Sequence, residues 1–137
     1  ISEYQIIIKG GQNNLEKTWD FVDYIGLKHG LVEHDADAFA MAVGEACQNA
    51  IHYSKTDIKM FELILKLDDE KIVAEIQNQG DPIDLENVEP FDKNQNFMQY
   101  KDGGLGLPLI KKIMDKVEYK RVNDNNILCL TKYISYE

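Results

Sequence analysis

The sequence predicts a single α+β domain over residues 1–137, a two-layer sandwich whose mixed, mostly antiparallel sheet is covered on one face by about three helices. Two observations lead to this fold class. Strand-like and helix-like segments follow one another in the order strand, helix, helix, strand, strand, long loop, helix, strand, strand. The last two strand pairs are joined by short polar segments that are typical of hairpin turns.

The first part of the chain contains one strand and two helices. Residues 4–9 are rich in β-branched side chains and stop at a pair of glycines, which predicts a strand. Asparagine 13 or 14 can cap a helix that ends near Gly30, because apolar residues follow at helical spacing: Leu15, Trp19, Val22, Ile25 and Leu27. Asp35 is the expected cap of a second helix over residues 36–51.

The second part contains two hairpins, a loop and a helix. Residues 60–76 predict a hairpin with its turn at Asp68-Asp69-Glu70. Residues 78–102 have little periodicity and many polar residues, and a loop of that length usually forms a lid or a binding loop. Apolar spacing predicts a third helix over residues 105–117, and residues 117–133 predict a final hairpin around four Asn and Asp residues.

Composition excludes several classes of partner. The formal net charge is −9, which disfavours binding to a phosphate backbone, and so to nucleic acid, and to an anionic membrane surface. We expect no membrane span, because no apolar stretch approaches the roughly 20 residues needed to cross a bilayer, and no signal peptide. Cys47 and Cys129 lie in apolar runs and are expected to be buried, reduced thiols. These features predict a cytoplasmic protein.

The most informative local feature is the pair Glu45 and Asn49 in the second predicted helix. Residues four apart share a helix face, so a carboxylate and a carboxamide project together from an otherwise apolar segment. Because an unpaired buried carboxylate is costly, we expect the pair to face a cavity with a polar occupant, such as a metal bound to phosphate. The alternatives are a helix face that meets solvent and a hydrogen-bonded core pair.

Two glycine-containing segments accompany this pair. Gly103-Gly104-Leu105-Gly106-Leu107 runs into the third predicted helix, where a backbone can approach phosphate. Residues 78–84 follow a predicted strand. Taken alone, the first of these segments could be a flexible joint and the second an ordinary turn.

Together, the three segments resemble the N box and the two glycine boxes of the GHKL (Bergerat-fold) ATPases, a superfamily with a histidine-kinase-like ATPase fold. The segment from Gly104 to Asp115 is most similar to the anti-sigma factor serine-protein kinases of the RsbW and SpoIIAB type. The resemblance covers essentially the whole chain. It implies ATP and Mg²⁺ as cofactors.

The resemblance also implies residue roles. Asn49 is the implied Mg²⁺ ligand, since a hard cation prefers oxygen, and Glu45 the implied general base. The nucleotide-binding positions would be Asn49, Asn78, Gly80, Asp84, Gly103, Gly104, Leu105, Gly106 and Leu107. Gly80 would let the chain pass close to adenine, and Gly104 and Gly106 would present backbone N–H groups to phosphate. The lid would span roughly residues 88–102.

The chain departs from the family pattern at three positions. The first glycine box normally begins with Asp, which accepts a hydrogen bond from the adenine amino group, whereas this chain has Asn78. An amide can accept from that amino group and donate to the neighbouring ring nitrogen. A common His is replaced by Tyr53, and a basic residue before the glycine run is replaced by Asp102, for which Lys101 or Lys93 could substitute.

Two functions follow from the resemblance. The first is an ATP-binding, anti-sigma-factor-like regulatory protein that acts as a serine kinase on an STAS-domain antagonist. Its implied partners are a sigma factor, the STAS-domain antagonist, or both, and a second copy in a homodimer formed through the first strand and first helix. The alternative is a catalytically inactive nucleotide-binding or protein-interaction module of the same fold.

Overall fold

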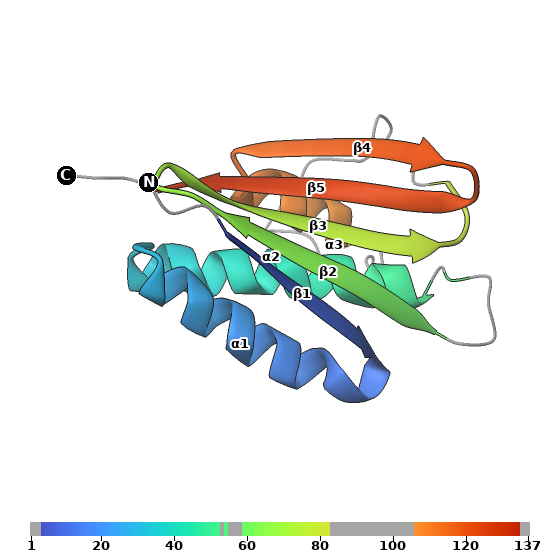
Figure 1. The fold of residues 1–137 in the computed structure, drawn as a ribbon, viewed down its shortest axis with the longest axis horizontal. Helices are drawn as coiled ribbons and strands as arrows, with labels where there is room; N and C mark the ends of the chain where they lie inside the picture. Colours follow the sequence, from blue (N-terminus) through green and yellow to red (C-terminus); the bar gives the residue numbers. More distant parts are fainter. Residues whose placement is uncertain (1–3, 53, 55–58, 83–105, 135–137) are drawn as a thin grey trace.

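The computed structural model describes residues 4–52, 54, 59–82 and 106–134. A short 3-10 turn, Gln12–Asn14, precedes the first helix. The elements in chain order are β1 (Tyr4–Gly11), α1 (Leu15–Lys28), α2 (Glu33–His52), β2 (Met60–Leu67), β3 (Lys71–Gln79), α3 (Gly106–Ile113), β4 (Lys116–Val122) and β5 (Asn125–Tyr133). The three helices form one layer and the strands the other (Figure 1). The predicted α+β sandwich and the predicted order of helices and strands are confirmed.

The sheet has the strand order β1-β2-β3-β5-β4, and every pairing between these described strands is antiparallel. Hairpins β2–β3 and β4–β5 form as predicted. They meet where β3 pairs with β5, which places Asn78 opposite Asn126 and Gln79 opposite Asn125. The end of β3 therefore lies beside the start of β5.

The turn between β2 and β3 is held by Asp68. Its Oδ1 accepts hydrogen bonds from the backbone N–H groups of Glu70 (2.8 Å) and Lys71 (3.0 Å), and these bonds to the charged form, the Glu70 bond first, lower the pKa of the carboxyl group. The ring of His29, just after α1, hydrogen-bonds through Nε2 to the backbone oxygen of Asp68. The end of α1 is thereby tied to the turn of the first hairpin.

The core lies between α2 and the helix-facing side of the sheet. Alternate residues of β2 and β3 are buried, as expected for a sheet with one covered face. Burying each large apolar side chain contributes about 1.5–3 kcal/mol. The largest fully buried apolar side chains are Phe39, Leu63, Leu65, Leu67, Ile72, Ile76, Ile110 and Leu130.

The first helix forms as predicted; it packs through Thr18, Val22 and Gly26, and Trp19 and Leu27 are 42% and 45% exposed. Two other predicted details are wrong. Asp35 does not cap α2, which already begins at Glu33. Cys129 is only half-buried, since it lies on the uncovered face of the sheet, whereas Cys47 is fully buried.

Two element boundaries also differ from the prediction. The first strand continues through both glycines, because Gly10 and Gly11 pair with Phe61 and Met60 of β2. A Cβ atom at Gly10 would lie 3.0 Å from the ring of Phe61, so a side chain there would crowd the ring. The third helix ends at Ile113, and the predicted last helical residue, Val117, is instead part of β4.

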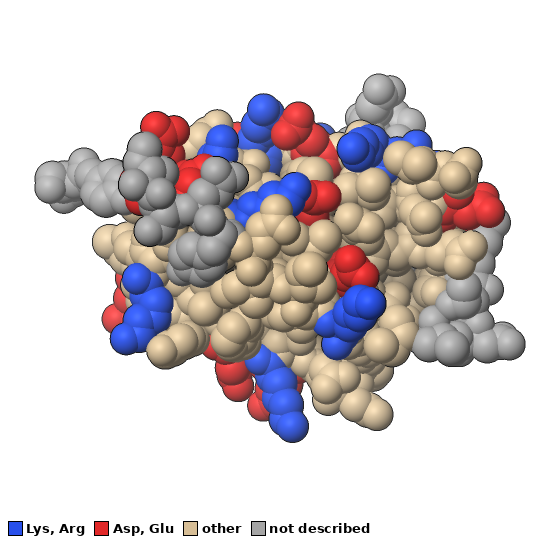
Figure 2. All heavy atoms as spheres, in the orientation of Figure 1, with Lys and Arg blue, Asp and Glu red and all other residues tan. Residues whose placement is uncertain are grey.

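The face of the sheet opposite the helices carries interspersed charges (Figure 2). Lys66 and Glu75 form an ion pair across β2 and β3, and Lys9 lies 3.7 Å from Glu62 across β1 and β2. The exposed pair of Lys9 and Glu62 contributes little to stability. No helix in the described ranges is both long and apolar enough to cross a membrane.

Candidate functional site

Helix α2 presents Glu45 and Asn49 as the spacing predicts. Both side chains are half-buried, while their neighbours Ala46, Cys47 and Ala50 are buried. Neither side chain is fully buried. Partial removal from water raises the pKa of the Glu45 carboxyl group, because desolvation disfavours its charged form.

The end of α2 meets the end of β3 through Ser54 and Gly80. These two residues form an isolated antiparallel bridge, and the backbone N–H of Ser54 donates to the oxygen of Ile51 in the last turn of α2 (3.3 Å). Gly80 is buried. The helix that carries Glu45 and Asn49 is thus joined directly to the glycine segment that follows β3, although the two lie far apart in the sequence.

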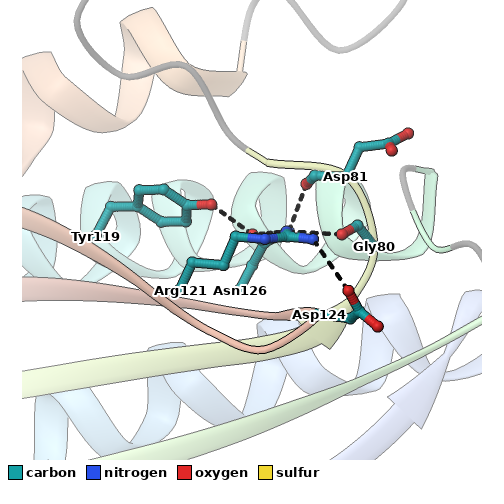
Figure 3. A network of polar contacts seen from close by, with 6 residues as sticks. All are labelled: Gly80, Asp81, Tyr119, Arg121, Asp124 and Asn126. Carbon is teal, nitrogen blue, oxygen red and sulfur yellow. Dashed lines mark hydrogen bonds and ion pairs between the residues drawn. The ribbon is translucent and has the colours of Figure 1, made fainter.

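Arg121 of β4 holds the same glycine segment from the other side (Figure 3). Its Nη1 donates to the backbone oxygen of Gly80 (2.7 Å), and its Nη2 lies 3.8 Å from Oδ1 of Asp124 in the β4–β5 turn. The backbone N–H of Gly80 in turn donates to the backbone oxygen of Asp124 (3.1 Å). Both backbone polar groups of Gly80 are therefore bonded to the second hairpin or its side chains.

Asn126 is the centre of this polar network. Its side chain is 1% exposed. Its Oδ1 accepts hydrogen bonds from the Tyr119 hydroxyl (2.5 Å) and from Arg121 Nη1 (2.9 Å), and its Nδ2 donates to the backbone oxygen of Asp81 (2.7 Å). The network fixes the path of the chain over residues 80–81.

Asn78 lies beside this network but is bonded differently. It is 8% exposed and faces the helical layer, as do the buried residues Ala74 and Ile76 on the same strand. Its amide nitrogen is buried and has no hydrogen-bond partner within the described part of the chain. Buried polar groups are normally hydrogen-bonded, so this nitrogen is available to donate to a polar ligand.

The third segment is described only in part. Gly106 is the first residue of α3, a helix that packs against α2, and the half-buried side chain of Leu107 packs against the core. Leu107 is therefore placed to support the helix, and only its backbone is free to serve a ligand. The other predicted ligand positions, Asp84 and Gly103 to Leu105, lie outside the described residues, as does the predicted lid over residues 88–102.

Sequence reasoning missed the residues that position the glycine segment: Ser54, Tyr119, Arg121 and Asn126. One signal was available for Asn126. It alternates with Leu128 and Leu130 on β5, so a polar residue occupies an inward position of a strand that otherwise faces the core. The same alternation puts Tyr119 and Arg121 on one face of β4. The predicted turn around residues 123–126 concealed this pattern.

The donor set suits a nucleotide with a divalent cation. Asn49 offers an amide oxygen, the kind of ligand that a hard cation prefers, and Glu45 offers a partly desolvated carboxylate. The first turn of α3 places the backbone N–H groups of Gly106 and Leu107 at the positive end of the helix dipole. The unpartnered nitrogen of Asn78 offers one further hydrogen-bond donor.

Comparisons with known proteins agree with this chemistry. The family model of the histidine kinase-like ATPase domain matches residues 12–132. Serine-protein kinase RsbW of Staphylococcus aureus (strain bovine RF122 / ET3-1) is 31% identical over 115 residues, which cover 79% of this chain and 72% of that protein. Serine-protein kinase RsbW of Halalkalibacterium halodurans is 30% identical over 117 residues, which cover 82% of this chain and 72% of that protein. The chain therefore belongs to the histidine kinase-like ATPase domain family and is a relative of the RsbW serine-protein kinases.

Proposed function

We propose that this chain is an ATP-binding, anti-sigma-factor-like regulatory protein that phosphorylates a serine on an STAS-domain antagonist. The observation that carries the proposal is the bridge between Ser54 and Gly80. It joins the helix that presents Glu45 and Asn49 to the glycine segment that follows β3, so two of the three family motifs meet in one place. The similarity to serine-protein kinases supports the choice of serine as acceptor.

Each side chain has a separate role in this proposal. Asn49 would hold Mg²⁺ through its amide oxygen, and the cation would neutralise charge on the triphosphate. Gly80 would allow the chain to lie close to the base. Backbone N–H groups at residues 104 and 106 would bind phosphate at the start of α3.

Glu45 would act as the general base. It would accept the proton of the serine hydroxyl as the serine oxygen bonds to the γ-phosphorus and the bond to ADP breaks. Its raised pKa favours this role, because a base is most effective when its pKa approaches the working pH. Its half-buried position leaves it accessible to a serine from a partner protein.

The proposed partners are proteins in the cytoplasm. They are a sigma factor, the STAS-domain antagonist that carries the serine, or both, and a second copy of this chain. Strand β1 is an edge strand of the sheet, and β1 and α1 expose Ile7 (59%), Trp19 (42%) and Tyr24 (54%). These side chains support the homodimer. Sedimentation of the parent chain and of Ile7→Lys would test it, and a parent that sediments as a monomer at high micromolar concentration would contradict it.

The alternative function is a catalytically inactive module that binds nucleotide or protein partners. One experiment separates the two. The chain is mixed with γ-labelled ATP, Mg²⁺ and the STAS-domain protein from the same genome, and serine phosphorylation is followed by mass spectrometry. Transfer that depends on Glu45 supports the kinase. Saturable ATP binding without any transfer supports the inactive module.

Glu45→Gln is the test variant for the kinase experiment, and Gln48→Glu is a matched control. Gln48 is exposed on the same helix. The control replaces an amide by a carboxylate there, whereas the test variant replaces the carboxylate of Glu45 by an amide. We expect Glu45→Gln to bind ATP and to lose transfer by at least about 100-fold, the usual contribution of a general base. Equal transfer rates for Glu45→Gln and the parent would contradict the assignment.

A further inference from the structure

We propose that Asn78 reads the edge of the purine base, and that its carboxamide allows the site to accept purines with either a 6-amino or a 6-oxo group. This inference rests on the nucleotide-binding function proposed above and adds the class of base. The observation behind it is the buried amide nitrogen of Asn78, which has no hydrogen-bond partner among the described residues.

The position of Asn78 suits a reading role. It is the second-last residue of β3, and the chain passes from it to Gly80, whose backbone is held on both sides by the neighbouring elements. More than nine-tenths of Asn78 is buried, and its side chain lies on the face of the sheet that the helices cover. A donor in such a place has lost water and gains from a ligand that brings an acceptor.

Asn126, directly opposite on β5, shows the contrasting case. Its amide is fixed in one orientation, because Oδ1 accepts from Tyr119 and Arg121 while Nδ2 donates to Asp81. Rotating this amide by half a turn would set Nδ2 against two donors. The amide of Asn126 is therefore fully used in holding the chain, whereas the amide nitrogen of Asn78 is available to a ligand.

Asn78 has no such constraint on its nitrogen. No hydrogen bond from Nδ2 to a described residue holds the amide in one of its two orientations. In this proposal the amide turns to present either its oxygen or its nitrogen to the bound base, because its nitrogen gives up no hydrogen bond to a described residue when it turns. Both amide atoms of Asn126 make hydrogen bonds to described residues, whereas the amide nitrogen of Asn78 makes none.

The orientation of the Asn78 amide determines which group at position 6 of a purine it can bind. At position 6, adenine carries an amino donor, whereas hypoxanthine and guanine carry a keto acceptor. The oxygen of an amide accepts from the amino group, and after rotation the nitrogen of the same amide donates to the keto group. A carboxylate has acceptors alone, so it attracts the amino group and repels the keto group. Asn78 in place of the aspartate of the family pattern therefore removes the basis for rejecting a 6-oxo purine.

The test compares ATP with inosine triphosphate. Hypoxanthine, the base of inosine triphosphate, differs from adenine only at position 6 and in the protonation of the adjacent N1. Because it also lacks the 2-amino group of guanine, the two bases have nearly the same shape. We would titrate the full chain with each nucleotide in the presence of Mg²⁺ by calorimetry. The expected result is that the two dissociation constants agree within tenfold. Inosine triphosphate binding more than tenfold weaker than ATP would overturn the inference and leave the proposed function intact.

Asn78→Asp provides the second arm of the test, and Gln79→Glu is its control. Gln79 is the next residue on β3, is exposed, and undergoes the same exchange of amide for carboxylate. We expect Asn78→Asp to weaken inosine triphosphate relative to ATP by at least tenfold, and Gln79→Glu to leave the ratio unchanged. An unchanged ratio in a folded Asn78→Asp variant would overturn the role of Asn78.

The outcomes also separate the two proposals. If neither nucleotide binds the parent chain, the proposed nucleotide-binding function fails and the inference fails with it. If Asn78→Asp does not fold, the comparison of ATP with inosine triphosphate on the parent chain still decides whether both classes of base are accepted.

Discussion

Replacing Asn126 by alanine is the sharpest test of the polar network that holds residues 80–81. The substitution removes one acceptor and one donor from a side chain that is 1% exposed. The Tyr119 hydroxyl loses its bond of 2.5 Å, Arg121 loses one of 2.9 Å, and the backbone oxygen of Asp81 loses one of 2.7 Å. Arg121 keeps its bond to the oxygen of Gly80.

The expected loss of stability follows from these three bonds. Each neutral hydrogen bond contributes about 1 kcal/mol, and the bond from the charged Arg121 contributes about 1.5–3 kcal/mol. Leaving the Asp81 oxygen without its partner adds to the cost, while water reaching the half-exposed Arg121 reduces it. We therefore expect Asn126→Ala to lower the free energy of unfolding by about 3–5 kcal/mol.

Urea denaturation followed by circular dichroism measures this loss. The matched control is Asn125→Ala, because Asn125 is the preceding residue on β5 and is exposed. We expect the control to change the free energy of unfolding by less than about 0.5 kcal/mol. A loss below about 1 kcal/mol for Asn126→Ala, with an unchanged m-value, would show that the hydrogen bonds of Asn126 do not stabilise the fold as proposed.

Three further predictions concern charge and backbone conformation. Burial raises the pKa of Asp23, and the adjacent Asp37 raises it further, so the ionised group destabilises the fold once the pH rises through this raised value. Asp23→Asn should therefore raise the free energy of unfolding more at pH 7 than at pH 3, and equal gains at both pH values in urea titrations would contradict this sign. Glu45 should limit phosphoryl transfer at acid pH, so the rate should fall as the pH drops through its raised pKa, and a rate profile that is flat down to pH 4.5 would argue against it as the base. Gly30 has φ +110°, so Gly30→Ala should lower the free energy of unfolding by about 1–2 kcal/mol. Gly44→Ala in α2 should raise it by up to about 1 kcal/mol, because alanine favours a helix and its Cβ would meet Trp19 at 3.8 Å without a clash. Thermal denaturation that shifts both variants in the same direction would contradict this difference between the two glycines.

Local patterns were sufficient to predict most of the fold. The hairpin over residues 60–76 was readable because alternation and a turn rich in Asp residues agree, and Asp68 does cap that turn. Helix α2 was readable because small apolar residues cover its buried side. The shared face of Glu45 and Asn49 follows from helical spacing alone and needs no tertiary information.

The errors occurred where a tertiary contact decides the outcome. Trp19 fits the helical period of α1 and its ring lies beside Gly44 of α2, yet it is 42% exposed, because α1 buries its small side chains instead. The network of Arg121 and Asn126 depends on the pairing of β3 with β5, two strands separated in the sequence by residues 80–124, which include α3 and β4. No local rule predicts which residue a cross-strand pairing will bring beside Gly80.

The most direct test of the central claim is a calorimetric titration of the chain with ATP, with and without Mg²⁺, repeated on Asn49→Ala and on the control Gln48→Ala. Gln48 is the exposed residue before Asn49 on the same helix. We predict saturable ATP binding that Mg²⁺ strengthens, that persists in Gln48→Ala, and that loses its dependence on Mg²⁺ in Asn49→Ala. Undiminished Mg²⁺-dependent binding to Asn49→Ala would contradict it.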